Sequence, residues 1–206
     1  MKTLLSLAFV LISSLTMLAN GPVNYSATVV DQYTFVLKLD EVINADIQVK
    51  IADQRGYILY EEQLAQHSID YRKYDLRNLP SGNYVLLVEF DNQIKVQPIL
   101  KTRASLELDN NLAETVLMPS LNYDEGYMNA NFFTEGAIAI GVKILDNEGN
   151  LVYAEDQQLA SPFHKRYDLT QLPTGAYTFR IQINNGITKL NFTEQVYVED
   201  AALAAN

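Results

Sequence analysis

Two stretches of the sequence nearly repeat each other: YDLRNLPSGNY at 74–84 and YDLTQLPTGAY at 167–177. The shift from 74 to 167 is 93 residues, and the same shift carries the VKI of 49–51 onto the VKI of 142–144. Self-similarity at a fixed spacing indicates copies of one structural unit. The chain is therefore predicted to contain two homologous domains.

The end of each repeated stretch predicts how the domain folds. Proline and glycine turn the chain, and the tyrosine that follows begins a strand whose alternate residues enter the core. Such a tyrosine buries its ring while its hydroxyl bonds back to the backbone of the turn, as in the tyrosine corner of immunoglobulin-like sandwiches. The predicted corner residues are Leu79, Pro80, Gly82 and Tyr84 in the first copy and Leu172, Pro173, Gly175 and Tyr177 in the second.

The remaining pattern is that of short strands. Residues 46–51 (DIQVKI) alternate strictly between polar and apolar, which indicates a half-buried strand, and no segment after the leader shows helical spacing. Hairpin turns are predicted at Asp53 to Gly56 and at Asp146 to Gly149. We expect an all-β chain of two tandem immunoglobulin-like antiparallel β-sandwiches, each with about seven strands.

The domain boundaries follow from the repeat and from the N-terminal leader. Residues 1–20 combine Lys2 with the apolar run 4–15 and small residues after it, the order of a secretory signal peptide, with cleavage expected near Ala19 or Gly21. The domains are predicted at 22–105 and 110–200, joined through 102–112, with a tail at 201–206. We expect an exported protein, periplasmic, at the cell surface or extracellular, with no membrane span after cleavage.

Composition excludes several classes of function. The 206 residues carry 15 basic and 25 acidic side chains, a net charge of −10, which disfavours nucleic acid as a partner. The absence of cysteine removes disulfides, thiolate nucleophiles and cysteine-ligated zinc. The two histidines, His67 and His164, do not align between the copies, so a shared metal or catalytic pair is disfavoured.

Candidate sites in the sequence also have simpler interpretations. The run 146–150 (DNEGN) offers oxygen ligands for calcium, but it lacks the glutamate of an EF-hand loop and fits a hairpin turn. Acidic pairs at 61–62, 124–125 and 199–200 are interpreted as surface charges. The aromatic residues Tyr71, Tyr74, Phe163 and Tyr167 lie near the strand before the corner and offer a candidate binding stripe, but packing of the sheet is the favoured interpretation of Tyr74 and Tyr167. No nucleophile elbow, phosphate loop or zinc motif is present. We therefore predict no enzyme activity, no cofactor and no metal.

The motifs of both copies resemble a known family. Asp-x-x-Gly, Tyr-Asp-Leu and Leu-Pro-x-Gly-x-Tyr are similar to the immunoglobulin-like C-terminal domains that sort exported Bacteroidetes proteins through type IX secretion, and to their small secreted relatives of unknown function. The resemblance implies a sandwich fold and export. The sequence departs from this family in two ways. Such domains normally follow a large cargo, whereas here we expect only the signal peptide ahead of the repeats. They also tend to end in a basic, apolar strand, whereas this sequence ends in 196–206 (VYVEDAALAAN).

From these observations we expect a secreted, non-enzymatic module that binds, adheres or scaffolds at the bacterial envelope or surface, with a protein or glycan partner. The alternative is a sorting or carrier element related to type IX secretion. A glycan-active enzyme is a third reading, since paired carboxylates need no local spacing in the sequence.

Overall fold

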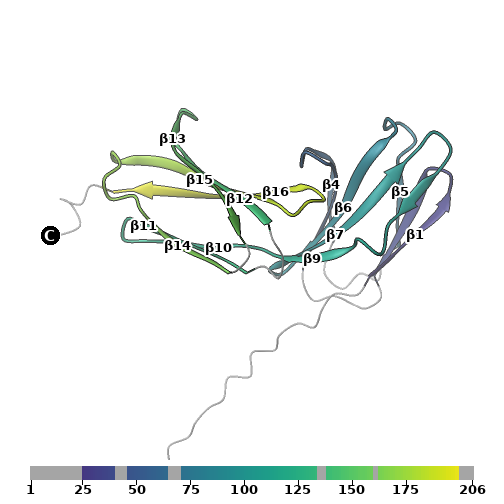
Figure 1. Ribbon diagram of the computed structural model, residues 1–206. Coiled ribbons are helices and arrows are strands. Elements are labelled where there is room, and N and C mark those ends of the chain that lie inside the picture. The colour runs from purple at the N-terminus through teal and green to yellow at the C-terminus, as the bar shows by residue number, and fades with distance from the viewer. Residues whose placement is uncertain (1–24, 40–45, 65–70, 134–137, 160–161, 200–206) are drawn as a thin grey trace, which may run out of the picture.

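The computed structural model describes residues 25–39, 46–64, 71–133, 138–159 and 162–199, and they form two β-sandwiches arranged end to end (Figure 1). The predicted leader at 1–20 and the tail at 201–206 lie outside these residues. All strand pairs among the described residues are antiparallel. The predicted class, two tandem all-β sandwiches, is confirmed.

The first sandwich packs a three-stranded sheet against a larger one. The smaller sheet has the order β1 (Tyr25–Asp31), β2 (Thr34–Leu39) and β5 (Tyr71–Asp75). The larger sheet has the order β4 (Ile58–Leu64), β3 (Ile47–Asp53), β6 (Gly82–Phe90), β7 (Gln93–Lys101) and β8 (Leu106–Leu108). The strand β9 (Glu114–Leu117) also pairs with β7.

The second sandwich repeats this topology. One sheet has the order β10 (Ser120–Asp124), β11 (Tyr127–Phe132) and β14 (Phe163–Asp168). The other has the order β13 (Leu151–Leu159), β12 (Ile138–Leu145), β15 (Gly175–Asn184) and β16 (Lys189–Val198). Seven strands in each copy therefore occupy matching places, and β8 and β9 are additions from the segment that joins the copies.

Alternation along the strands fills both cores. In β6 the residues Tyr84, Leu86, Val88 and Phe90 are buried between the sheets, and in β15 the matching residues Tyr177, Phe179, Ile181 and Ile183 are buried in the same way. Successive side chains of a strand point to opposite faces, so one apolar set lines each core. The hydrophobic effect on these apolar side chains holds the cysteine-free sandwiches together.

A tyrosine closes the turn before β6 and before β15. The Tyr84 hydroxyl donates to the Pro80 carbonyl at 2.8 Å, and the Tyr177 hydroxyl donates to the Pro173 carbonyl at the same distance. Both rings are buried. Each hydroxyl is thereby paired while its ring adds apolar surface to the core.

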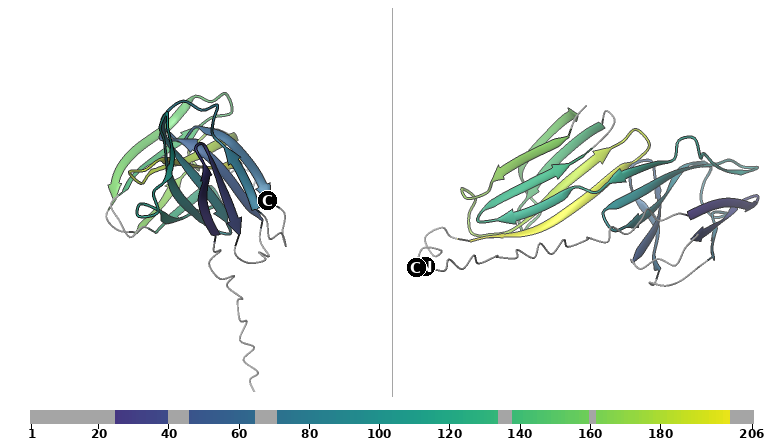
Figure 2. Two further views of the ribbon diagram at one scale, coloured as in Figure 1. Left: turned by 90° about the vertical axis from the view of Figure 1, so that its right-hand side faces the viewer. Right: turned by 90° about the horizontal axis from the view of Figure 1, so that it is seen from below.

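The outer face of the larger first sheet is apolar, unlike its counterpart. Val85 and Leu87 are buried on the face opposite Tyr84, whereas the matching Thr178 is half-buried and the matching Arg180 is exposed. Leu87 lies opposite Val96 in the ladder, and Arg180 lies opposite Thr193. One continuous apolar cluster includes this outer face, Val116 of β9 and the core of the second sandwich. The two sandwiches therefore share a packed junction. Figure 1 labels β9 on the side of the first sandwich that faces the second, and the right-hand view of Figure 2 shows the two sandwiches meeting end to end.

Polar contacts fix the same junction. The Thr188 hydroxyl, in the β15–β16 loop, donates to the Asp53 carbonyl at 3.2 Å, and the Asn185 amide donates to the Glu114 carboxylate. Gly56 sits so close to this loop that a Cβ there would lie 2.1 Å from the Lys189 carbonyl oxygen. Only a residue without a side chain fits at that point.

No helix among the described residues is both long enough and apolar enough to span a bilayer.

The corner tyrosines give the first prediction. Tyr84→Phe and Tyr177→Phe should each lower the free energy of unfolding by roughly 1 kcal/mol, because each leaves a carbonyl without its partner at the corner. Urea denaturation measures the change. Tyr57→Phe is the control, since Tyr57 is exposed in the β3–β4 hairpin. Equal stability of all three variants would contradict a stabilising corner.

The junction gives a second prediction, with a matched pair of glycines. Gly56 and Gly149 occupy equivalent turns with φ of 82° and 84°, but an added Cβ meets nothing within 4 Å at Gly149. Gly149→Ala should therefore destabilise by about 1 kcal/mol through backbone strain alone. Gly56→Ala should destabilise clearly more and increase the radius of gyration measured by small-angle X-ray scattering, because the Lys189 carbonyl must move away. Identical behaviour of the two variants would argue against the junction.

Candidate functional site

A carboxylate joins the two sheets of the first sandwich. Glu62, on the edge strand β4, accepts hydrogen bonds from the Tyr74 hydroxyl at 2.6 Å and from the Tyr60 hydroxyl at 3.0 Å. The Arg72 guanidinium lies 3.6 Å from the same carboxylate. Tyr74 and Arg72 belong to β5 in the opposite sheet, so Glu62 connects the sheets at their open side. We call this arrangement the carboxylate clasp.

The second sandwich contains the same clasp. Glu155 on β13 accepts hydrogen bonds from the Tyr167 hydroxyl and the Lys165 ammonium of β14, and from the Tyr153 hydroxyl at 2.9 Å. The shift of 93 residues carries each member of the first clasp onto its counterpart, with lysine replacing arginine. The sequence signal for the clasp is that both copies have a glutamate at this position, Glu62 and Glu155. The alternation of polar and apolar residues does not by itself single out these two glutamates.

Burial and hydrogen bonding set the charges of the clasp. Burial, followed by the hydrogen bond to the carboxylate, raises the pKa of Tyr74 and Tyr167 far above the ordinary phenol value, so both phenols stay neutral. Burial alone would raise the pKa of Glu155, but its hydrogen bonds from Lys165, Tyr167 and Tyr153 outweigh burial and lower it. An ionised Glu155 carboxylate that accepts three hydrogen bonds, two of them from neutral phenols, stabilises the second sandwich.

The clasps lie beside two edge strands that expose apolar side chains. In β4 the residues Ile58, Leu59 and Tyr60 are exposed, next to the exposed Tyr57 of the β3–β4 hairpin. In β13 the residues Leu151, Val152 and Tyr153 are exposed at the places that match Ile58, Leu59 and Tyr60. The ladder shifts register between Ile51 and Ala52 and, equivalently, between Ile144 and Leu145. Such a β-bulge re-aims the side chains of an edge strand. We call β4 and β13 the apolar edges.

A shallow groove follows the apolar edge of the first sandwich. It has a volume of about 250 Å³, and Leu59 and Tyr60 line it together with Tyr74 and Leu76 from the β5 side. Leu59 and Tyr60 are adjacent in sequence yet face the same groove, as the bulge between β3 and β4 allows. An edge strand carries backbone groups without a ladder partner on one side, so this place can accept a further strand.

The predicted hairpin turns are formed by aspartate side chains. The Asp53 carboxylate accepts from the amides of Arg55 and Tyr57, and Gly56 takes a positive φ. The Asp146 carboxylate accepts from the amides of Glu148 and Asn150, and Gly149 takes a positive φ. These hydrogen bonds lower the pKa of both aspartates. In each turn one carboxylate oxygen thus accepts from two backbone amides, and the other accepts from a side chain, that of Arg55 in the first turn and of Asn150 in the second.

The other sequence candidates are dispersed. His164 is exposed on β14 with its Nδ1 2.9 Å from the Asn131 amide oxygen, whereas His67 and Asp200 lie outside the described residues. Tyr74, Tyr167 and Phe163 are buried in the sheets, and Tyr71 is exposed. Within the described ranges no group of three or more histidine or acidic residues is placed to hold a metal ion.

The clasp of the second sandwich predicts a pH dependence. Because the pKa of Glu155 is lower in the folded chain than its usual 4.5, its contribution to stability is present above about pH 4.5 and is lost as the pH falls through the folded value. Glu155→Gln should melt at a lower temperature than the parent at neutral pH, and the difference should shrink on acidification. Glu194→Gln, at an exposed position of β16, serves as control. A constant difference at all pH values would contradict the ionised clasp.

Comparisons with known proteins place these sandwiches in context. The chain is similar to the solved structure of dimeric latent PorU from Porphyromonas gingivalis, with 11% identity over 86% of this chain and 20% of that chain and a TM-score of 0.33. It is also similar to a biofilm-associated BSP domain, with 13% identity over 86% of this chain and a TM-score of 0.29, and it spans 29% of that chain. A two-domain fibronectin type III segment of chicken tenascin is matched at 10% identity over 86% of this chain and 99% of the segment, with a TM-score of 0.29. No curated protein matches the sequence.

The family comparison is more specific. The sequence model of the secretion system C-terminal sorting domain matches twice, at residues 31–102 and 125–193, once in each sandwich. Each match contains a complete corner, hairpin turn and clasp. The resemblance in the sequence motifs is therefore confirmed, and the chain belongs to the secretion system C-terminal sorting domain family.

Proposed function

We propose that this protein is a sorting or carrier element of a type IX-related secretion system, exported by the machinery that its two domains engage. The observation that carries the proposal is the separate family match of both sandwiches. Membership of a sorting family indicates an exported protein, which agrees with the expected leader. We favour this role over the adhesive role that the sequence alone suggested. It requires no catalysis by this chain.

The surface we propose for recognition is the pair of apolar edges. Both repeats present apolar residues there, and the same strands carry only acidic charges: Glu61 and Glu62 on β4, and Glu155 and Asp156 on β13. Neither strand contains the lysine or proline that commonly blocks an edge against pairing. An extended segment of the secretion machinery with apolar and basic side chains would complement these edges.

Export of a reporter tests the proposal. A periplasm-targeted fluorescent protein fused ahead of residues 22–206 should reach the surface or medium of a Bacteroidetes host that has the secretion system, and should stay inside a secretion-deficient mutant. The double variant Leu59→Lys and Val152→Lys should lower export several-fold, because lysine opposes strand pairing. Retention of the parent fusion in the periplasm would overturn the sorting proposal.

Leu100→Lys is the matched control for the edge variants. Leu100 is 42% exposed, close to the 39% of Leu59, but it lies on β7, which pairs with β6 on one side and with β8 on the other. Equal export of this control and the edge variant would show that recognition uses another surface.

A second candidate is a binding module at the envelope. It is favoured by a polar groove beside the first sandwich, lined by residues of β1, β7 and the segment that joins the sandwiches.

A further inference from the structure

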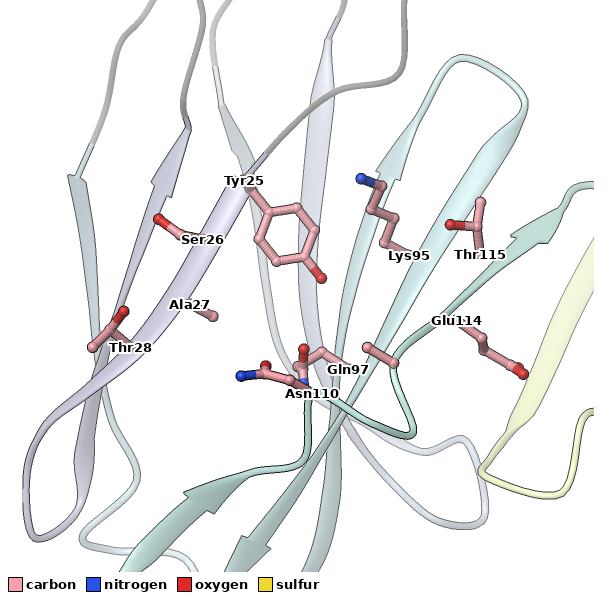
Figure 3. Close-up of a pocket in the computed structure, with 10 residues that line it drawn as sticks. Tyr25, Ser26, Ala27, Thr28, Lys95, Gln97, Asn110, Glu114 and Thr115 are labelled. Carbon is pink, nitrogen blue, oxygen red and sulfur yellow. The ribbon is translucent and has the colours of Figure 1, made fainter.

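A polar groove opens between the first strand and the segment that joins the two sandwiches (Figure 3). Its volume is about 580 Å³, within the range of ligand sites in proteins. Residues 25–28 of β1 form one wall, and residues 110 and 113–115 form the other. Lys95 and Gln97 of β7 line the groove between these walls and form its floor.

The lining is rich in neutral hydrogen-bonding groups. It contains a phenol, two carboxamides and three aliphatic hydroxyls, from Tyr25, Gln97, Asn110, Ser26, Thr28 and Thr115. Figure 3 shows the Tyr25 hydroxyl directed toward the carboxamides of Gln97 and Asn110. Hydroxyls and carboxamides can both donate and accept hydrogen bonds, so they suit a ligand that does the same.

Several of these groups remain available to a ligand. Within the part of the chain that the structure describes, no hydrogen bond engages the Tyr25 hydroxyl, the Asn110 carboxamide or the Thr115 hydroxyl. The Gln97 side chain is held in place by donation to the Asp109 carbonyl at 2.8 Å. Partial burial raises the pKa of Tyr25 to about 12, so its hydroxyl is a neutral donor at physiological pH.

Charge contributes little inside the groove. The Glu114 side chain is directed away from the groove in Figure 3, and its carboxylate accepts from Asn185 of the second sandwich. The Lys95 ammonium lies 5.4 Å from the centre of the Tyr25 ring. Among the described lining residues Lys95 is the one cation, whereas recognition of a polyanion uses several.

The groove is absent from the repeated part of the fold. Of the ten described residues that line it, eight fall outside the two segments that match the family, and the exceptions are Lys95 and Gln97. The ladder position of Lys95, opposite Val88, is taken in the second sandwich by Phe192, opposite Ile181. Phe192 packs against the core there, so an apolar side chain occupies the place of the groove floor. The groove therefore results from joining the repeats and is a property of this chain beyond its family fold.

We propose that this groove binds a neutral carbohydrate. A sugar presents hydroxyl groups in several directions, each able to donate and to accept, and the Tyr25, Gln97, Asn110 and Thr115 side chains offer matching partners from three segments of the chain. The open shape fits one part of a longer glycan chain and leaves its ends in solvent. Carbohydrate binding by this groove does not depend on whether the apolar edges direct export.

The test uses the whole chain without residues 1–20 and two kinds of probe. Neutral oligosaccharides (chitotriose, cellotriose and mannotriose) and the purified surface polysaccharide of the host bacterium are titrated by calorimetry, with pentalysine and inorganic phosphate as the peptide and anion probes. We expect at least one carbohydrate to bind. Asn110→Ala should weaken that binding about 3- to 10-fold, the effect of one or two lost hydrogen bonds.

The matched control is Asn111→Ala, since Asn111 is the exposed neighbour of Asn110 and does not line the groove. It should bind as the parent does, and melting temperatures should show that both variants are folded. Three results would overturn the proposal: no binding of any carbohydrate, equal weakening by both variants, or binding of phosphate or pentalysine alone. Export of the Asn110→Ala fusion separates the two proposals, because it should equal that of the parent.

Discussion

Strand β6 is buried on both faces, and the arrangement of the molecule depends on this constraint. One face closes the core of the first sandwich through Leu86 and Val88, and the other joins the second sandwich through Val85 and Leu87. A strand in that position cannot tolerate a polar residue on either face without a buried partner. The second copy is free of the constraint, and its equivalent outer face carries Arg180. Duplicated domains have thus become unequal in chemistry while keeping one topology.

The sequence allowed the topology to be predicted because its signals are local. Alternation, the Leu-Pro-x-Gly-x-Tyr turn and the aspartate hairpins each report on a few neighbouring residues, and the repeat shows them twice. The packed junction between the sandwiches is not among the sequence predictions, although the sequence contains a signal for it. The run 85–88 (VLLV) is apolar on both faces of its strand, whereas the matching run 178–181 (TFRI) alternates between polar and apolar residues. The clasp and the groove depend on residues brought together from different strands, which no local pattern specifies. Tyr74, for example, bonds Glu62 from the opposite sheet. The two residues meet only because of the order in which the strands pair.

The features that recur in both repeats are of two kinds, those that stabilise the fold and those that do not. The corner and the clasp recur in both copies, with the same tyrosine hydroxyl bonds to the proline carbonyl and to the glutamate carboxylate, as expected of features that hold a small sandwich without disulfides. The apolar edges also recur, but exposing apolar strand residues gives no benefit to folding and creates a risk of aggregation. A repeated feature that is unfavourable for the isolated protein is best explained by a partner, which is the physical reason to connect the edges with recognition.

The packed junction also fixes how the two apolar edges lie relative to each other. Two recognition edges on flexibly joined domains would bind almost independently, whereas two edges on one packed body meet a partner with a fixed separation and orientation. The second contact then adds avidity only to a partner whose own sites match that geometry, and a mismatched partner gains nothing from it. If the apolar edges act in recognition as proposed, the contact of Gly56 with the Lys189 carbonyl and the pairing of β9 with β7 would bear on specificity as well as stability. In the same way the joining segment, ordered by its pairing with β7, holds one wall of the polar groove in place, so a single packed junction supports both surfaces.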